Sequence, residues 1–378
     1  MLQQSPDWTR LPTDILVLIF SHLPFHSRYH ASLVCTSWSH CFQSSQLWSR
    51  FTFWFYVPSH GAFVTGAKKY GHHMKHVYIE VDQRDAVNRT NACTVIRCLG
   101  ELPERRLKTL KVTFIGTNPY FYAGGEFIDA LMVLFGPVKD HCRMLHQLTD
   151  VDLSGLTVAY DDKLFDTLSE NHKHIEKFDI QNRVLVCRVT PSCILRFVRQ
   201  CTKLRDLRVF NYSLCEEVLL ALTEGNRQPL EHFSVKCRRD EKYIKEIDDS
   251  AWNALSTHLP NLRVTLIFDH TCPFNKISDA MKPSIPVSEL YLETFTYICD
   301  EVRQAATLYK DTLEKLVLQT PMSRTSSELN ASLIILARDC KQLKSLHIYC
   351  VLNEETVNKI LELCPYLKEH KTYTLKTS

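Results

Sequence analysis

Histidines, cysteines and acidic pairs are the residues whose spacing could indicate chemistry, and none of them forms a recognised reactive pattern. His72 and His76 have the i, i+4 spacing of a helical zinc site, but no glutamate accompanies them in the HExxH manner. Two further groups are His141, Cys142 and His146, and His270 with Cys272. The pairs Asp161-Asp162 and Asp248-Asp249 are typical of solvated loops, and neither a Gly-x-Ser-x-Gly motif nor a P-loop occurs. We therefore expect no metal, no cofactor and no catalytic residue.

The fifteen cysteines are an odd number and contain no Cys-x-x-Cys. The first ten residues, MLQQSPDWTR, lack a secretory pattern, and no run of 18 apolar residues suggests a membrane span. These features predict a reducing compartment, cytoplasmic or nuclear, in which the cysteines are free thiols and mostly small buried side chains. An enzyme that uses a surface thiol is a weaker alternative.

Charge gives little support for a nucleic-acid or membrane partner. The 378 residues include 45 basic and 42 acidic side chains, a net charge of +3. The basic clusters at 105–108 and 236–239 are short, whereas a nucleic-acid binder concentrates such residues on one face. The scarcity of glycine, 10 residues, also argues against phosphate-binding loops.

Most of the chain is a repeat of the form Leu-x-x-Leu-x-Leu, with other apolar residues allowed at the leucine positions. Copies start at Met74, Leu107, Leu148, Ile175, Leu204, Leu230, Val287, Leu313 and Leu343, with an ambiguous register near Leu259 or Leu262 and a degenerate copy at Leu367. The spacing from Leu148 onward is typical of leucine-rich repeats. Each copy predicts a short strand followed by a helix, and stacked copies share one core. Cys201, Cys340 and Cys364 recur three positions before a strand, which indicates packing.

Side chains between and after the last two leucines of each strand point outward on the concave face of such an array. They form a column of mixed charge and aromatic character, and the candidate ligand-binding residues in it are Asp152, Asp179, Arg208, Phe210, Lys236, Tyr291, His347 and Tyr349. A loop at 118–125, inserted before a helix predicted from Glu126 to Phe135, serves either recognition or packing.

The N-terminal segment has a different pattern, that of short amphipathic helices. Apolar residues follow Thr13 at helical spacing, Pro12 and Pro24 bracket the first helix, and a third helix passes through Trp38 and Phe42. A unit of ~40 residues cannot bury so many large apolar side chains internally, so some of them must face a partner.

Residues 8–50 resemble the F-box. The matching residues are Leu11-Pro12-x-Asp14-Ile15-Leu16, Ile19-Phe20-x-x-Leu23-Pro24, Arg28, Ala31-Ser32-Leu33-Val34-Cys35-x-x-Trp38 and Leu47-Trp48. Segments such as NALSTHLPNLRVTLIF and CPYLKEHKTYTLK resemble the repeat half of F-box/leucine-rich-repeat proteins. The resemblance implies an α/β fold, in which an N-terminal three-helix F-box is followed by a leucine-rich-repeat solenoid. Parallel strands would line its concave face, and helices its convex face.

The resemblance also implies a domain order and a role. An adaptor-binding F-box would occupy residues 1–50, a linker or first packing layer 51–73, and a substrate-binding repeat domain 74–378. The Skp adaptor would contact Leu11, Pro12, Ile15, Leu16, Ile19, Leu23, Pro24, Leu33, Val34, Cys35 and Trp38. The chain would be a non-catalytic receptor that brings a protein substrate to a cullin-RING ubiquitin ligase for ubiquitination and proteasomal degradation.

Two alternatives remain open for the N-terminal segment. It would be a mere helical cap if the protein is a leucine-rich-repeat scaffold outside any ligase. It would be a helix-turn-helix DNA reader only with a basic recognition helix, and residues 36–42 carry no lysine or arginine.

Overall fold

The computed structural model describes residues 11–117, 124–137, 147–184, 186–294, 298–320 and 326–377. The chain divides into two compact units, Met1–Thr157 and Val158–Ser378, which are considered in turn. Residues 118–123 of the predicted loop, and the group His141, Cys142 and His146, lie outside the described residues.

The first unit begins with short helices. They are α1 (Thr13–His22), α2 (Phe25–Ser32), α3 (Thr36–Phe42) and α4 (Ser45–Trp48). Helix α1 starts directly after Pro12 and ends at His22. Its C-cap residue Leu23 has the extended backbone that is favoured before a proline. Pro24 then precedes α2, so two prolines fix the ends of the first helix as the sequence predicts.

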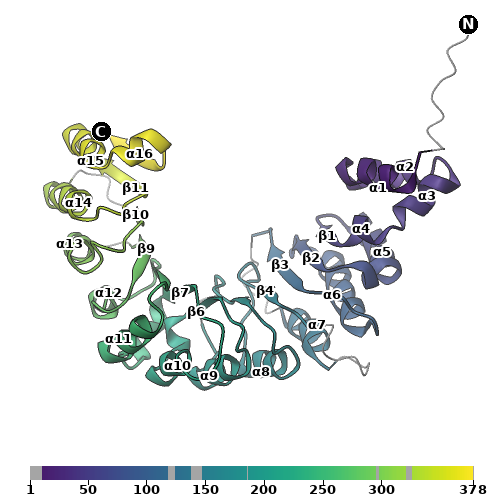
Figure 1. The fold of residues 1–378 in the computed structure, drawn as a ribbon, viewed down its shortest axis with the longest axis horizontal. Coiled ribbons are helices and arrows are strands. Elements are labelled where there is room, and N and C mark those ends of the chain that lie inside the picture. The colour runs from purple at the N-terminus through teal and green to yellow at the C-terminus, as the bar shows by residue number, and fades with distance from the viewer. Residues whose placement is uncertain are drawn as a thin grey trace, which may run out of the picture. The chain divides into compact units, whose positions relative to one another are not determined.

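Strands and helices alternate through the rest of this unit (Figure 1). The elements are β1 (Arg50–Phe55), η2 (Pro58–Gly61), α5 (Ala62–Tyr70), η3 (Gly71–His73), β2 (His76–Val81), α6 (Ala86–Glu101), β3 (Thr109–Phe114), α7 (Gly125–Phe135) and β4 (Asp150–Asp152). The strands are parallel and pair in sequence order. The solenoid therefore starts one repeat earlier than Met74. Phe51, Phe53 and Phe55 pair with Val77, Ile79 and Val81 and are buried with them.

The second unit continues the alternation of strands and helices. Its elements are α8 (Asp162–Asn171), β5 (Lys177–Asp179), α9 (Pro191–Gln200), β6 (Asp206–Phe210), η4 (Asn211–Ser213), α10 (Glu216–Ala221), β7 (His232–Cys237), η5 (Arg239–Tyr243), α11 (Asp249–His258), β8 (Arg263–Phe268), α12 (Phe274–Ala280), β9 (Val287–Glu293), α13 (Cys299–Leu308), β10 (Lys315–Gln319), α14 (Ser327–Asp339), β11 (Ser345–Leu352), α15 (Glu354–Leu363), α16 (Pro365–His370) and β12 (Tyr373–Thr377). The strands β5 to β12 are parallel and follow sequence order. The helices cover one face of these strands and leave the concave face open (Figure 1). The predicted leucine-rich-repeat fold is confirmed.

One repeat illustrates how each unit builds its core. Thr190 accepts a hydrogen bond from the Cys193 amide, and Pro191 occupies the first turn, so the sequence sets the start of α9. The buried face of α9 includes Phe197, whose ring stacks on Phe178 of β5 at a centroid distance of 4.2 Å. The helix and the strand thus bury apolar surface against each other that neither could bury alone.

The cysteines behave as the sequence predicts. Every cysteine among the described residues is a free thiol, and Cys201, Cys340 and Cys364 are buried. Burial raises the pKa of the Cys201 and Cys340 thiols to about 12, so both are protonated near neutral pH. In the described part of the chain, no group of three or more His, Cys, Asp or Glu side chains could hold a metal ion. None of the described helices is both long and apolar enough to span a membrane.

Candidate functional site: an exposed apolar face and a paired concave column

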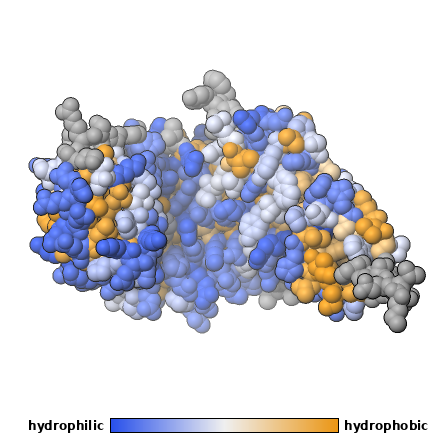
Figure 2. Space-filling model, turned by 90° about the horizontal axis from the view of Figure 1, so that it is seen from above, coloured by the Kyte–Doolittle hydropathy of each residue, from blue (hydrophilic) through white to orange (hydrophobic). Residues whose placement is uncertain are grey.

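Helix α1 presents large apolar side chains to solvent. Ile15, Leu18 and Ile19 are 45%, 56% and 40% exposed. Leu33 and Val34, which follow α2, are each 66% exposed. We call these five residues the apolar face. Figure 2 shows hydrophobic residues on the surface at the right-hand end of the view, the end at which Figure 1 places α1 to α3. Exposed apolar groups of this size are typical of a surface that binds a protein.

The opposite side of α1 forms the interior of the helical unit. Leu16, Val17 and Phe20 are buried, and the Trp38 ring meets the Phe20 ring edge-on at 5.7 Å. The prediction that Leu16 contacts the adaptor is therefore corrected: its side chain is 1% exposed and packs inside the chain. Leu18, which is not among the predicted contacts, is exposed instead.

The other candidate adaptor contacts lie at the surface to different degrees. Pro12 and Pro24 are exposed, together with Ile15, Ile19, Leu33 and Val34 of the apolar face. Leu11, Leu23, Cys35 and Trp38 are half-buried. Apart from Leu16, the predicted residues therefore keep surface that a partner could cover.

Arg28 forms hydrogen bonds between the helices of the F-box-like unit. Its guanidinium donates to the carbonyl oxygens of Phe20, Leu23 and Leu47 at 3.0, 3.2 and 3.1 Å. These carbonyls lie at the ends of α1 and α4, where few backbone acceptors have i+4 partners, and the Phe20 carbonyl also accepts the Leu23 amide. Burial lowers the pKa of Arg28, but the group remains a cation at physiological pH. Arg28 thereby links the C-terminal ends of α1 and α4.

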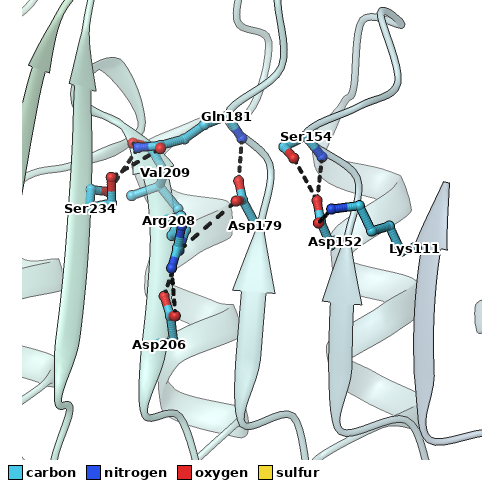
Figure 3. A network of polar contacts seen from close by, with 9 residues as sticks. All are labelled: Lys111, Asp152, Ser154, Asp179, Gln181, Asp206, Arg208, Val209 and Ser234. Atoms are coloured by element: carbon cyan, nitrogen blue, oxygen red, sulfur yellow. Dashed lines mark hydrogen bonds and ion pairs between the residues drawn. The ribbon is translucent and has the colours of Figure 1, made fainter. Parts of the chain in front are cut away.

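On the concave face of the first unit, Asp152 is paired within the chain. The Lys111 ammonium lies 2.7 Å from its carboxylate, and the Ser154 amide and hydroxyl donate to it at 3.0 and 2.6 Å (Figure 3). Burial raises the pKa of Asp152, but these hydrogen bonds more than offset it and leave the pKa below its ordinary value. Asp152 is thus an ionised carboxylate that is already satisfied.

Polar residues of the concave-face column in the second unit are also paired within the chain. Arg208 donates to both carboxylate oxygens of Asp206 and lies 4.0 Å from Asp179 (Figure 3). Asp179 also accepts a hydrogen bond from the backbone N–H of Gln181. The side-chain amide of Gln181 donates to the carbonyl oxygens of Val209 and Ser234. These contacts link the neighbouring strands β5, β6 and β7, so part of the column serves the sheet itself.

Phe210 is predicted to be an outward-facing residue of the concave face, but its side chain is buried. Its side chain is only 2% exposed, because the guanidinium of Arg238 from the next repeat lies 3.7 Å from its ring centroid. Arg238 is itself buried and paired with Asp240 at 3.2 Å. The alternation of inward and outward side chains along a strand cannot predict that a side chain from a neighbouring repeat will cover an outward residue.

The remaining candidates of the column are more accessible. Lys236 lies 3.9 Å from Asp269, and burial lowers its pKa against the opposing effect of that carboxylate. Tyr291 donates to Glu289 at 2.9 Å, and His347 lies between the hydroxyls of Ser345 and Thr374 at 2.9 and 3.0 Å. Tyr349 is exposed. The column offers a mixed surface and does not identify one ligand class.

Known proteins are similar to this chain both in its N-terminal helices and in its repeats. The family model F-box-like matches residues 8–54. Human F-box/LRR-repeat protein 8 is 27% identical over 97% of this chain and 94% of its own length. Sheep F-box/LRR-repeat protein 21 is 24% identical over 95% of this chain and 80% of its own length. A solved TLR13–ssRNA13 complex is similar with a TM-score of 0.31 and 10% identity, covering 82% of this chain and 47% of that one.

These matches confirm the resemblance to F-box/leucine-rich-repeat proteins. The chain has an F-box-like domain at its N-terminal end, followed by a leucine-rich-repeat solenoid. An F-box-like domain implies a protein partner, and the apolar face lies within the matched residues.

Proposed function

We propose that this chain is the substrate-recognition subunit of an SCF-type ubiquitin ligase. The F-box-like helices bind the Skp adaptor and thereby join the chain to the cullin-RING core. The repeats bind a protein substrate, which is then ubiquitinated and degraded by the proteasome. The chain itself carries out no chemistry: it raises the local concentration of substrate lysines near the charged ubiquitin-conjugating enzyme.

The exposed apolar face is the observation that supports this proposal most strongly. Burying one Leu, Ile or Val side chain contributes about 1.5–3 kcal/mol, so covering the five residues of this face favours a stable complex. Pro12 and Pro24, which precede α1 and α2, are also exposed, and Trp38 is half-buried. Such an apolar centre with few charges is typical of permanent interfaces.

Substrate binding is assigned to the concave column. We propose that Tyr291, His347 and Tyr349 provide contact area, because Tyr349 is exposed and the other two are half-buried. Asp152, Asp179, Arg208 and Lys236 provide charge, and a substrate must compete with or extend their existing pairs. Phe210 is left out of this set because Arg238 covers it.

Reconstitution tests the ligase assignment. The full chain is mixed with purified Skp adaptor and then with the cullin-RING core, and each mixture is analysed by size-exclusion chromatography. We expect equimolar co-elution with the adaptor, and ubiquitin-conjugating activity in pull-downs of the assembled complex. A leucine-rich-repeat scaffold outside any ligase would elute without the adaptor, as a stable protein, and would bring down no conjugating activity.

A further inference from the structure

A cavity of about 480 Å³ lies between the F-box-like helices and the first repeat. Its walls come from α2, α3, α4, β1, η2 and α5, all in the first unit. Aromatic rings dominate the lining, among them Phe25, Phe42, Trp48, Phe63 and Tyr70. This volume falls within the range of small-molecule sites, roughly 300–1,000 Å³.

The aromatic walls are held in place by contacts with one another. Phe25 lies 5.2–6.3 Å from the rings of Phe42, Trp48, Phe51 and Phe63. Trp48 stacks on Tyr70 at 4.1 Å with an interplanar angle of 14°. The indole N–H of Trp48 donates to the Phe42 carbonyl at 2.7 Å, so this polar group is already satisfied. The inner part of the cavity therefore suits a flat apolar group.

The lining of the cavity includes an exposed cationic side chain. Lys69 lines the cavity and is exposed, with its ammonium 5.0 Å from the Tyr70 ring centroid. His60 also lines it, whereas no aspartate or glutamate does in the described part of the chain. A ligand with an anionic group at one end would place that group beside Lys69 and its apolar body among the rings.

We propose that this cavity binds small ring compounds that carry a single anionic group. The proposal goes beyond adaptor binding and does not rest on it, because the cavity-lining residues named here do not belong to the apolar face. Gly66 provides the means to test it. It lies within α5 and lines the cavity, and a Cβ atom added there would meet nothing within 4 Å.

Two variants at Gly66 separate filling of the cavity from any effect on the helix. Both Gly66→Leu and Gly66→Ala improve the helix propensity of α5, so neither should unfold it. Only Gly66→Leu adds a side chain large enough to occupy the space in which a ligand ring would lie. Gly66→Ala is therefore the matched control.

The probes are 1-anilinonaphthalene-8-sulfonate and N-phenyl-1-naphthylamine, which differ by the sulfonate group. Both are titrated into the full chain and followed by their fluorescence. We expect Gly66→Leu to weaken binding of both probes by about tenfold or more, because the leucine side chain would take space that a ligand ring needs, and Gly66→Ala to leave it nearly unchanged. Lys69→Met should weaken only the sulfonate probe, by about two- to fivefold, the range of an exposed ion pair.

Three outcomes would overturn the proposal. Equal binding by wild type and Gly66→Leu would place the probes elsewhere, for example on the apolar face. Equal losses for both probes in Lys69→Met would remove the preference for an anion. Displacement of the probes from wild type by saturating Skp adaptor would assign the cavity to the adaptor interface. Adaptor binding by Gly66→Leu, measured in parallel, keeps this result separate from that of the ligase assignment.

Discussion

Replacing Ile15 by glutamate together with Ile19 by lysine is expected to weaken adaptor binding by at least about 100-fold, the loss typical of two central interface anchors. Both side chains are large, apolar and exposed on one side of α1. The substitution would bury two charges in an interface built for apolar contact, which costs more than the lost contacts alone. Adaptor affinity is measured by calorimetric titration of the full chain.

The same double variant should keep its fold. Glutamate and lysine at i, i+4 support a helix, and the exposed positions leave the buried side of α1 intact. Ile115→Glu serves as the matched control, because Ile115 is 50% exposed but lies after β3, outside the F-box-like helices. If the double variant bound the adaptor with wild-type affinity, the apolar face would not be the docking surface.

Leu16→Ala is expected to destabilise the N-terminal helices by about 2–5 kcal/mol, the cost of removing a buried leucine side chain. Leu16 is only 1% exposed and lies on the side of α1 that carries Val17 and Phe20. The neighbouring substitution Ile15→Ala removes an exposed side chain and should change the stability by less than about 0.5 kcal/mol.

Urea unfolding followed by tryptophan fluorescence measures this difference, since Trp38, Trp48 and Trp54 lie in or next to the affected helices. The adaptor is left out, so that binding does not stabilise the folded state. Equal unfolding midpoints for Leu16→Ala and Ile15→Ala would contradict the assignment of Leu16 to the interior and restore it as an adaptor contact.

The repeats were predictable from sequence because their signal is local and periodic. Leu316 and Leu318 are buried while Lys315 and Val317 alternate with them, as the Leu-x-x-Leu-x-Leu pattern requires. The sequence does not predict the strand Arg50–Phe55 as a repeat because residues 53–56 are all aromatic, which obscures the alternation. Its period-two alternation, with Phe51, Phe53 and Phe55 buried, was nevertheless the correct signal.

The orientation of α1 could not be predicted because residues 15–20 are all apolar. A run of six consecutive apolar residues gives no indication of which of them face the core, so Leu16 and Leu18 could not be told apart. Phe210 and Arg238 illustrate a second limit, since a cation–π contact between repeats depends on tertiary distance. The pairing of Lys111 with Asp152 is of the same kind.

Hydrogen–deuterium exchange of the full chain, with and without purified Skp adaptor, tests the central claim most directly. The account predicts that the adaptor slows amide exchange across α1, α2 and the residues up to Cys35, and leaves the strands of Val158–Ser378 unchanged. Adaptor-dependent protection confined to the repeat strands, or no protection at saturating adaptor, would contradict it.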